Sequence, residues 1–150
     1  MARSYYEGGQ GDLVKWFQGK LRNIEDGSAK ALEQAVEDGK DTMREMISQR
    51  GTGRVWSRPG PTGRDRSAPG RVDTGHMRDS VDSYFNVTSK GNAVGRFGWI
   101  KSREDYFGLQ EGGFEHPSGI TVEGMYAMVD AGELAWSEFQ RRVEEAIKNA

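Results

Sequence analysis

Five carboxylates crowd twenty residues in the second half of the chain, and they are the side chains best placed to do chemistry. They are Glu104, Asp105, Glu111, Glu115 and Glu123. Such a group could converge on a divalent cation or supply an acid and a base. The spacing fits no calcium-binding loop, and acidic pairs also occur elsewhere in the chain. A solvated acidic rim, complementary to a basic segment of a neighbouring subunit, is the simpler interpretation.

The other reactive side chains lack the neighbours that catalysis or metal binding requires. His76 and His116 have no partners at zinc-ligand spacing, and the chain has no cysteine. No glycine-rich loop matches a phosphate-binding motif, and no serine or threonine has a base beside it in the sequence. We therefore expect a protein that is not an enzyme and binds neither a metal nor any other cofactor. A metal-dependent hydrolase that uses the acidic stretch is the enzymatic alternative.

Residues 50–78 form the most unusual segment of the sequence. Seven arginines against two aspartates give it a net charge of +5, whereas the whole chain carries −2. A connection this long without secondary structure is usually functional or disordered. We expect residues 50–72 to form a flexible basic arm and residues 73–78 to belong to the fold. The arm residues expected to dock on a partner are Arg50, Arg54, Trp56, Arg58, Arg64, Arg66 and Arg71.

The arm could bind either protein or nucleic acid. Arginine and tryptophan are enriched at the energetic centres of protein interfaces. The same side chains could also contact phosphates and stack on bases. Because the chain as a whole is slightly acidic, it does not resemble a general nucleic-acid-binding domain. We favour docking on a neighbouring protein, with a nucleic-acid-binding module as the alternative.

The sequence also indicates the cellular compartment in which the chain is made. No apolar run approaches the roughly 18–20 residues needed to cross a bilayer, and the first residues contain no apolar signal core. We therefore expect synthesis in the cytoplasm and no membrane partner. The absence of cysteine fits a reducing compartment.

Residues 12–49 are predicted to form a long amphipathic helix, with Asp12 as its N-cap. Apolar or small side chains recur at steps of three and four residues from Phe17 to Met46. The middle of this stripe is small, so we expect a second helix to cross there: Ser28, Ala31, Ala35 and Gly39. Residues 26–28, Asp-Gly-Ser, are a weak point at which the helix could break or kink.

Residues 73–122 are predicted to form a short helix followed by a small antiparallel sheet. Asp73 or Thr74 could cap a helix that starts at His76. A β-hairpin then brackets the turn at residues 89–92, and Gly95 and Gly98 indicate a bulge or a close backbone approach. Residues 104–111 predict one or two helical turns that end at two glycines, and residues 116–119 predict a turn.

Residues 123–148 are predicted to form the C-terminal helix, because their apolar positions keep helical spacing. Gly132 weakens its first half by about 1 kcal/mol relative to alanine. Two amphipathic helices and a small sheet must share one core. Residues 1–150 are therefore expected to form a single α+β domain in which the long N-terminal helix and the C-terminal helix pack with a small antiparallel β-sheet.

The order of these segments resembles the tail-component family of tailed bacteriophages. A T-G-x-[ML]-R-x-S-[VI] signature covers residues 74–81, as TGHMRDSV. A Y-x-x-x-x-E-x-G stretch begins at Tyr106, and a His-Pro turn follows at His116. Residues 122–127, VEGMYA, depart from the family pattern, which has a proline and an aromatic-leucine pair in that place.

The resemblance implies a structural virion protein at the head–tail junction or upper tail, a tail-completion or connector protein. Its implied partners are copies of itself in a ring, the neighbouring neck and tail proteins, and, non-specifically, the DNA in the channel. Thr74, Gly75 and Arg78 would fix the start of the hairpin, while Tyr106 and Glu111 would pack or hydrogen-bond near the sheet edge. The motif positions together are Thr74, Gly75, Met77, Arg78, Ser80, Tyr106, Glu111, Gly112, His116 and Pro117.

Overall fold

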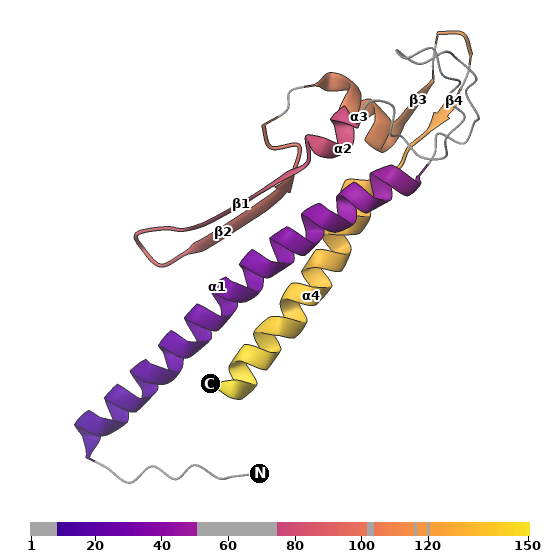
Figure 1. Ribbon diagram of the computed structural model, residues 1–150. Helices are drawn as coiled ribbons and strands as arrows, with labels where there is room; N and C mark the ends of the chain where they lie inside the picture. Colours follow the sequence, from indigo (N-terminus) through magenta and orange to yellow (C-terminus); the bar gives the residue numbers. More distant parts are fainter. Residues whose placement is uncertain (1–8, 51–74, 102–103, 116, 120) are drawn as a thin grey trace.

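The computed structural model describes residues 9–50, 75–101, 104–115, 117–119 and 121–150. The chain has the predicted α+β architecture, with a long N-terminal helix, a C-terminal helix and small antiparallel sheets (Figure 1). Its elements are α1 (Gln10–Gln49), α2 (His76–Asp79), β1 (Asp82–Val87), β2 (Ala93–Gly98), α3 (Asp105–Gly112), β3 (Gly113–Glu115), β4 (Thr121–Glu123) and α4 (Ala127–Asn149).

Helix α1 is continuous over 40 residues, which makes it about 60 Å long at 1.5 Å per residue. It begins after Gly9 rather than at Asp12, and Asp12 lies inside its first turn. The expected break at residues 26–28 is absent. A Cβ atom on Gly27 would lie 2.7 Å from the Cβ of Ala146, so this glycine serves the close approach of α4.

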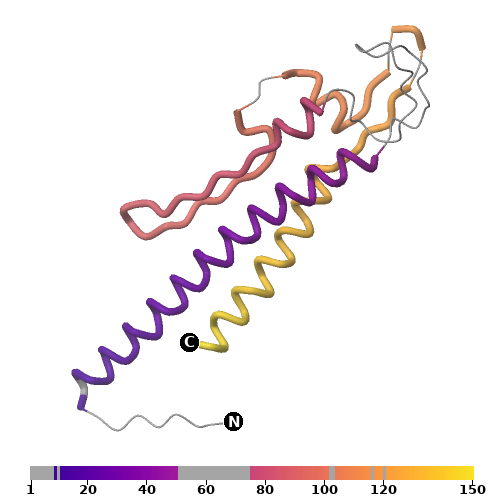
Figure 2. Tube along the Cα trace, in the orientation of Figure 1, coloured from indigo at the N-terminus to yellow at the C-terminus, as the bar shows by residue number. Residues whose placement is uncertain are grey.

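Helices α1 and α4 run antiparallel, side by side (Figures 1 and 2). At one end of the pair, Lys20 Nζ contacts the backbone oxygen of Ala150. At the other end, Arg50 donates from Nη1 to the Met125 carbonyl at 2.7 Å and to Asp130 Oδ2 at 2.5 Å. The predicted close packing on the small stripe is confirmed, since Ala31 and Ala35 are buried.

The predicted β-hairpin is confirmed and lies along α1. Strands β1 and β2 pair antiparallel in a regular register from Asp82 opposite Gly98 to Val87 opposite Ala93. Gly95 marks a close approach and not a bulge, because a Cβ there would lie 2.5 Å from Val36 Cγ2. Gly39 of α1 makes room for the hairpin and not for a helix, since its Cβ would lie 2.6 Å from the Phe97 ring.

A second two-stranded sheet, β3 with β4, was not predicted as a separate element. Gly113 pairs with Glu123, and Glu115 with Thr121. Gly113 has a φ of 79°, and a Cβ on it would lie 2.6 Å from the Gly124 nitrogen. This pairing draws residues 121–123 into a strand, so the C-terminal helix begins at Ala127 instead of residue 123.

The main apolar core lies where the end of α1 meets α2, α3 and the start of α4. Its buried members are Met43, Ile47, Met77, Val81, Phe107, Met125, Ala127 and Ala131. The Trp99 ring packs on Phe107 with 5.2 Å between ring centroids and donates from Nε1 to the Met77 carbonyl at 2.9 Å. Helix α2 is capped by Gly75 at a φ of 84°, in place of the expected Asp73 or Thr74; those two residues lie outside the described ranges.

One ion pair ties the two long helices together midway. Arg142 Nη2 of α4 lies 2.7 Å from Asp38 Oδ2 of α1, and Gln34 Nε2 donates to Asp38 Oδ1 at 3.2 Å. Burial raises the pKa of the Asp38 carboxyl, but the hydrogen bonds from Arg142 and Gln34 outweigh it. The net result is a pKa below the ordinary value of 3.8.

Replacing Asp38 with asparagine is expected to lower the free energy of unfolding by about 0.5–1 kcal/mol at pH 7, because the pair is partly exposed. A carboxyl whose folded-state pKa is depressed stabilises above its unfolded pKa and loses that effect as the pH falls through the folded value. The difference between the wild type and Asp38→Asn should therefore shrink below pH 3.8. Urea unfolding at pH 7 and pH 3 measures the free energy of unfolding of the wild type, of Asp38→Asn and of the control variant Glu145→Gln. If Asp38→Asn differs from the wild type by the same amount at both pH values, the ion pair does not stabilise the fold.

Candidate functional site

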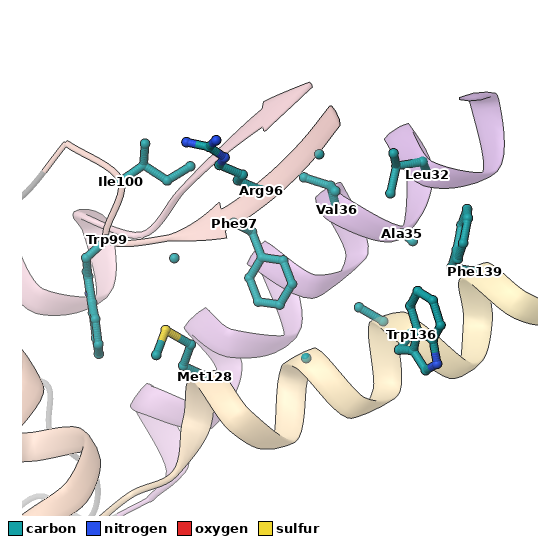
Figure 3. Close-up of a pocket in the computed structure, with 14 residues that line it drawn as sticks. Leu32, Ala35, Val36, Arg96, Phe97, Trp99, Ile100, Met128, Trp136 and Phe139 are labelled. Carbon is teal, nitrogen blue, oxygen red and sulfur yellow. The ribbon is translucent and has the colours of Figure 1, made fainter. Parts of the chain in front are cut away.

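An open apolar groove runs between the hairpin and α4, with α1 as its floor (Figure 3). Its volume is about 690 Å³. Leu32, Ala35 and Val36 supply the floor, Phe97 and its strand neighbours one wall, and α4 the other. Among the described residues that line it, Arg96 alone carries a charge. An apolar groove of this kind, open to solvent, suits a protein partner more than a small ligand, which needs several convergent polar groups.

The α4 wall belongs to an apolar stripe along that helix. Val129, Gly132, Trp136, Phe139 and Val143 recur at steps of three and four residues. Val129 is 51% exposed and Trp136 60%. The Trp136 and Phe139 rings lie 5.5 Å apart, centroid to centroid. Exposed apolar surface of this extent on a helix marks an interaction site.

A second exposed apolar face lies on the first turns of α1. Val14 is 49% exposed, Phe17 53% and Leu21 57%. This part of α1 projects past the level at which Lys20 meets Ala150 (Figures 1 and 2). Phe17 and Leu21 continue the stripe that is buried further along the helix at Ala31 and Ala35.

The carboxylates expected to form an acidic rim do not act as one group. Glu111 is buried, and its carboxylate accepts hydrogen bonds from the first three amides of α4: Ala127 N at 3.0 Å, Met128 N at 2.8 Å and Val129 N at 3.3 Å. Tyr126, the N-cap residue of α4, makes no capping side-chain hydrogen bond within the described part of the chain. Glu111 therefore caps α4 from another element, at the end of the helix that favours negative charge.

The other four carboxylates are exposed on α3, β3 and β4 and their approaches: Glu104, Asp105, Glu115 and Glu123. Glu104 Oε1 lies 3.4 Å from His76 Nε2. Among the described residues, no three histidine or acidic side chains gather where they could hold a metal ion. The expected contribution of Glu111 to an acidic rim is wrong, because its carboxylate is used inside the fold.

The remaining motif residues have local structural roles where the structure describes them. Gly75 starts α2 at a positive φ, Met77 is buried in the core, and the Arg78 guanidinium pairs with Asp79 at 2.7 Å. Ser80 Oγ donates to the His76 carbonyl at 2.6 Å. Tyr106 is 43% exposed and packs edge-on against Phe107. Gly112 ends α3, and Pro117 lies in a turn; Thr74 and His116 lie outside the described residues.

The first residue of the expected basic arm belongs to the fold. Arg50 is the C-cap of α1 and holds α4 through the Met125 carbonyl and Asp130. The other arm positions lie outside the described residues: Arg54, Trp56, Arg58, Arg64, Arg66 and Arg71. Without Arg50, residues 51–74 keep five arginines against two aspartates.

Sequence reasoning missed the groove and the capping role of Glu111. The groove arises because Gly39 and Gly95 allow the hairpin to pack closely on α1. The sequence does not show which residue each glycine contacts. For Glu111 a signal existed. The glycines at 113 and 124 permit the close backbone approach that brings the two segments together, since a Cβ on Gly124 would lie 2.8 Å from the backbone oxygen of Glu111.

Comparisons with protein-family models, with curated proteins and with solved structures found no match for this chain. No helix in the described ranges is long and apolar enough to cross a membrane.

Replacing Glu111 with alanine is expected to lower the free energy of unfolding by about 1–3 kcal/mol, because three amides at a helix start lose their acceptor. Glu111→Gln keeps one acceptor oxygen and should lose less. Glu145→Ala, which removes an exposed partner of Arg141, should cost less than about 0.5 kcal/mol. Denaturant unfolding monitored by circular dichroism compares the three variants; equal losses for Glu111→Ala and Glu145→Ala would disprove the capping role.

Proposed function

We propose that this chain is a structural virion protein of a tailed bacteriophage, placed at the head–tail junction or upper tail as a tail-completion or connector protein. Several copies would form a ring around the DNA passage. The observation that carries the proposal is the exposure of large apolar side chains on both long helices. Phe17, Leu21, Trp136 and Ile147 are each more than half exposed.

An isolated subunit of this kind leaves much of its apolar surface uncovered. The described part of the chain buries its core mainly at one end, while the outer halves of α1 and α4 keep apolar faces in solvent. Association of several copies would cover these faces and so gain the free energy of apolar burial. Closed rings arise when one surface of each copy binds a different surface of the next. The order of sequence motifs adds the resemblance to a phage tail component.

The basic residues 51–74 would extend the contacts of such a ring. Their arginines would dock on a neighbouring neck or tail protein or on a neighbouring copy of this chain, whose exposed carboxylates such as Glu115 offer complementary charge. Such pairing guides encounter and register more than it adds affinity. The finished particle would carry the protein in its neck or tail after assembly in the host cytoplasm.

The purified chain is expected to form a closed ring, with a mass that is a whole multiple of 16.7 kDa in native mass spectrometry and a central hole in electron micrographs. In the phage that encodes it, inactivating the gene should leave filled heads and tails unjoined, since a neck component would be missing. Virions that assemble and infect normally without the protein would refute the proposal.

A nucleic-acid-binding module is the second candidate, favoured by the five arginines in residues 51–74. It predicts affinity for DNA that falls with salt, with a log–log slope of about −0.9 for each phosphate neutralised. Replacing Arg54, Arg58, Arg64 and Arg66 with serine should then flatten the slope and weaken binding. Fluorescence anisotropy with a DNA duplex at several salt concentrations measures both; an unchanged slope would exclude this candidate.

A further inference from the structure

Gly132 lies in the α4 wall of the groove, and none of its neighbours among the described residues requires a glycine there. Apart from its chain neighbours and the backbone of its own helix, no described atom would lie within 4 Å of a Cβ added there. Glycine is among the least favourable residues in a helix interior. Gly27, Gly39 and Gly95 differ, because each would bring a Cβ within 2.7 Å of a neighbouring residue. The space at Gly132 is thus left open toward the groove.

The residues around Gly132 form the kind of hole that accepts a side chain from a facing helix. Gly132, Ala135, Trp136 and Phe139 stand at positions i, i+3, i+4 and i+7 of α4, and all four line the groove. Four residues at this spacing make the hole that receives one knob residue when two helices pack. Glycine at the first corner deepens the hole, and the Trp136 and Phe139 rings supply apolar walls (Figure 3).

The first turns of α1 carry a matching set of knobs. Val14, Phe17 and Leu21 stand at i, i+3 and i+7, the anchor spacing of helices that bind in apolar grooves. This segment cannot reach the groove of its own chain. Leu32 of the same continuous helix already lies in the groove floor, about 16 Å along the axis from Leu21. Only a second copy can bring residues 14–21 to Gly132.

We propose that the first turns of α1 from one copy lie in the groove of the next, with Phe17 as the knob in the hole at Gly132. The proposal rests on the ring of the proposed function and names the surfaces that neighbouring copies share. In the proposed ring each groove receives the helix end of the previous copy, so the contact is head-to-tail and propagates from copy to copy. Both apolar faces, which are exposed in the single chain, become buried in one contact.

Filling the hole tests the proposal. Gly132→Leu should keep the fold, because open space surrounds the position, yet it should weaken self-association at least tenfold. Gly108→Leu is the matched control, since Gly108 also lies in a helix with open space around it but away from the groove. Phe17→Ser should weaken association as Gly132→Leu does. Melting curves check folding, and sedimentation of the full chain measures association. Wild-type association in Gly132→Leu would overturn the contact.

Engineered cysteines locate the contact directly, because the natural chain has none. A chain with Phe17→Cys and Ala135→Cys should give a ladder of disulfide-linked dimers, trimers and larger species on oxidation. Lys15→Cys with Ala135→Cys is the control, since Lys15 lies on the opposite face of α1. Dimers from Phe17→Cys alone would show symmetric pairing of the helix ends and overturn the proposal, as would the absence of any ladder.

These outcomes separate the contact from the proposed function. If Gly132→Leu still forms a ring, the proposed contact is wrong and the proposed ring is retained. A cysteine ladder from a protein whose gene is dispensable for virion assembly keeps the contact and removes the phage-neck function.

Discussion

The start of α4 is capped by one carboxylate from another element. Glu111 accepts hydrogen bonds from the first three amides of α4, and no residue of α4 itself performs this task in the described part of the chain. Glu111 is in turn held by the close backbone contact between residues 112–113 and Gly124, which the β3–β4 pair maintains. The short helix α3, the second sheet and the start of α4 are therefore held together as one structural unit. Because this unit sets where α4 begins, it also helps to place the α4 wall of the groove.

From this unit the two long helices extend away from the core, and fewer of their large side chains are buried as the distance from the core grows. Near this unit, Met43, Ile47 and Phe107 are almost completely buried. Further along, α4 is held against α1 by the Asp38–Arg142 ion pair, the close approach of Ala146 to Gly27 and the contact of Lys20 with Ala150. The outer faces carry aromatic and aliphatic side chains in solvent. The end of the helix pair at the core thus stabilises the fold, and the opposite end carries the exposed apolar side chains available for association.

The sequence predicted the elements better than their contacts. Periodicity located α1, the hairpin, α3 and α4, because helix and strand spacing are local properties of a chain. The start of α1 was misplaced because Gly9 and not Asp12 is its N-cap, and the start of α4 because residues 121–123 pair in a strand. Arg50 was assigned to the arm because its partners, Met125 and Asp130, are 75 and 80 residues away in the chain. The hole at Gly132 was equally hidden, because a glycine in a helical pattern shows only a cost until its surroundings are known.

The pairing of α1 with elements made much later has a consequence during protein synthesis. Helix α1 is completed by residue 49, but the hairpin and α4, which cover most of it, begin only at residues 82 and 127. Until the hairpin and α4 have emerged, the stripe of α1 lacks its two main partners among the described elements, and a helix alone in water is marginal. The nascent chain therefore passes through a long interval in which the apolar stripe of α1 is without these partners. Native folding waits for a late event, the closing of a loop between α1 and α4, and this distance along the chain slows folding.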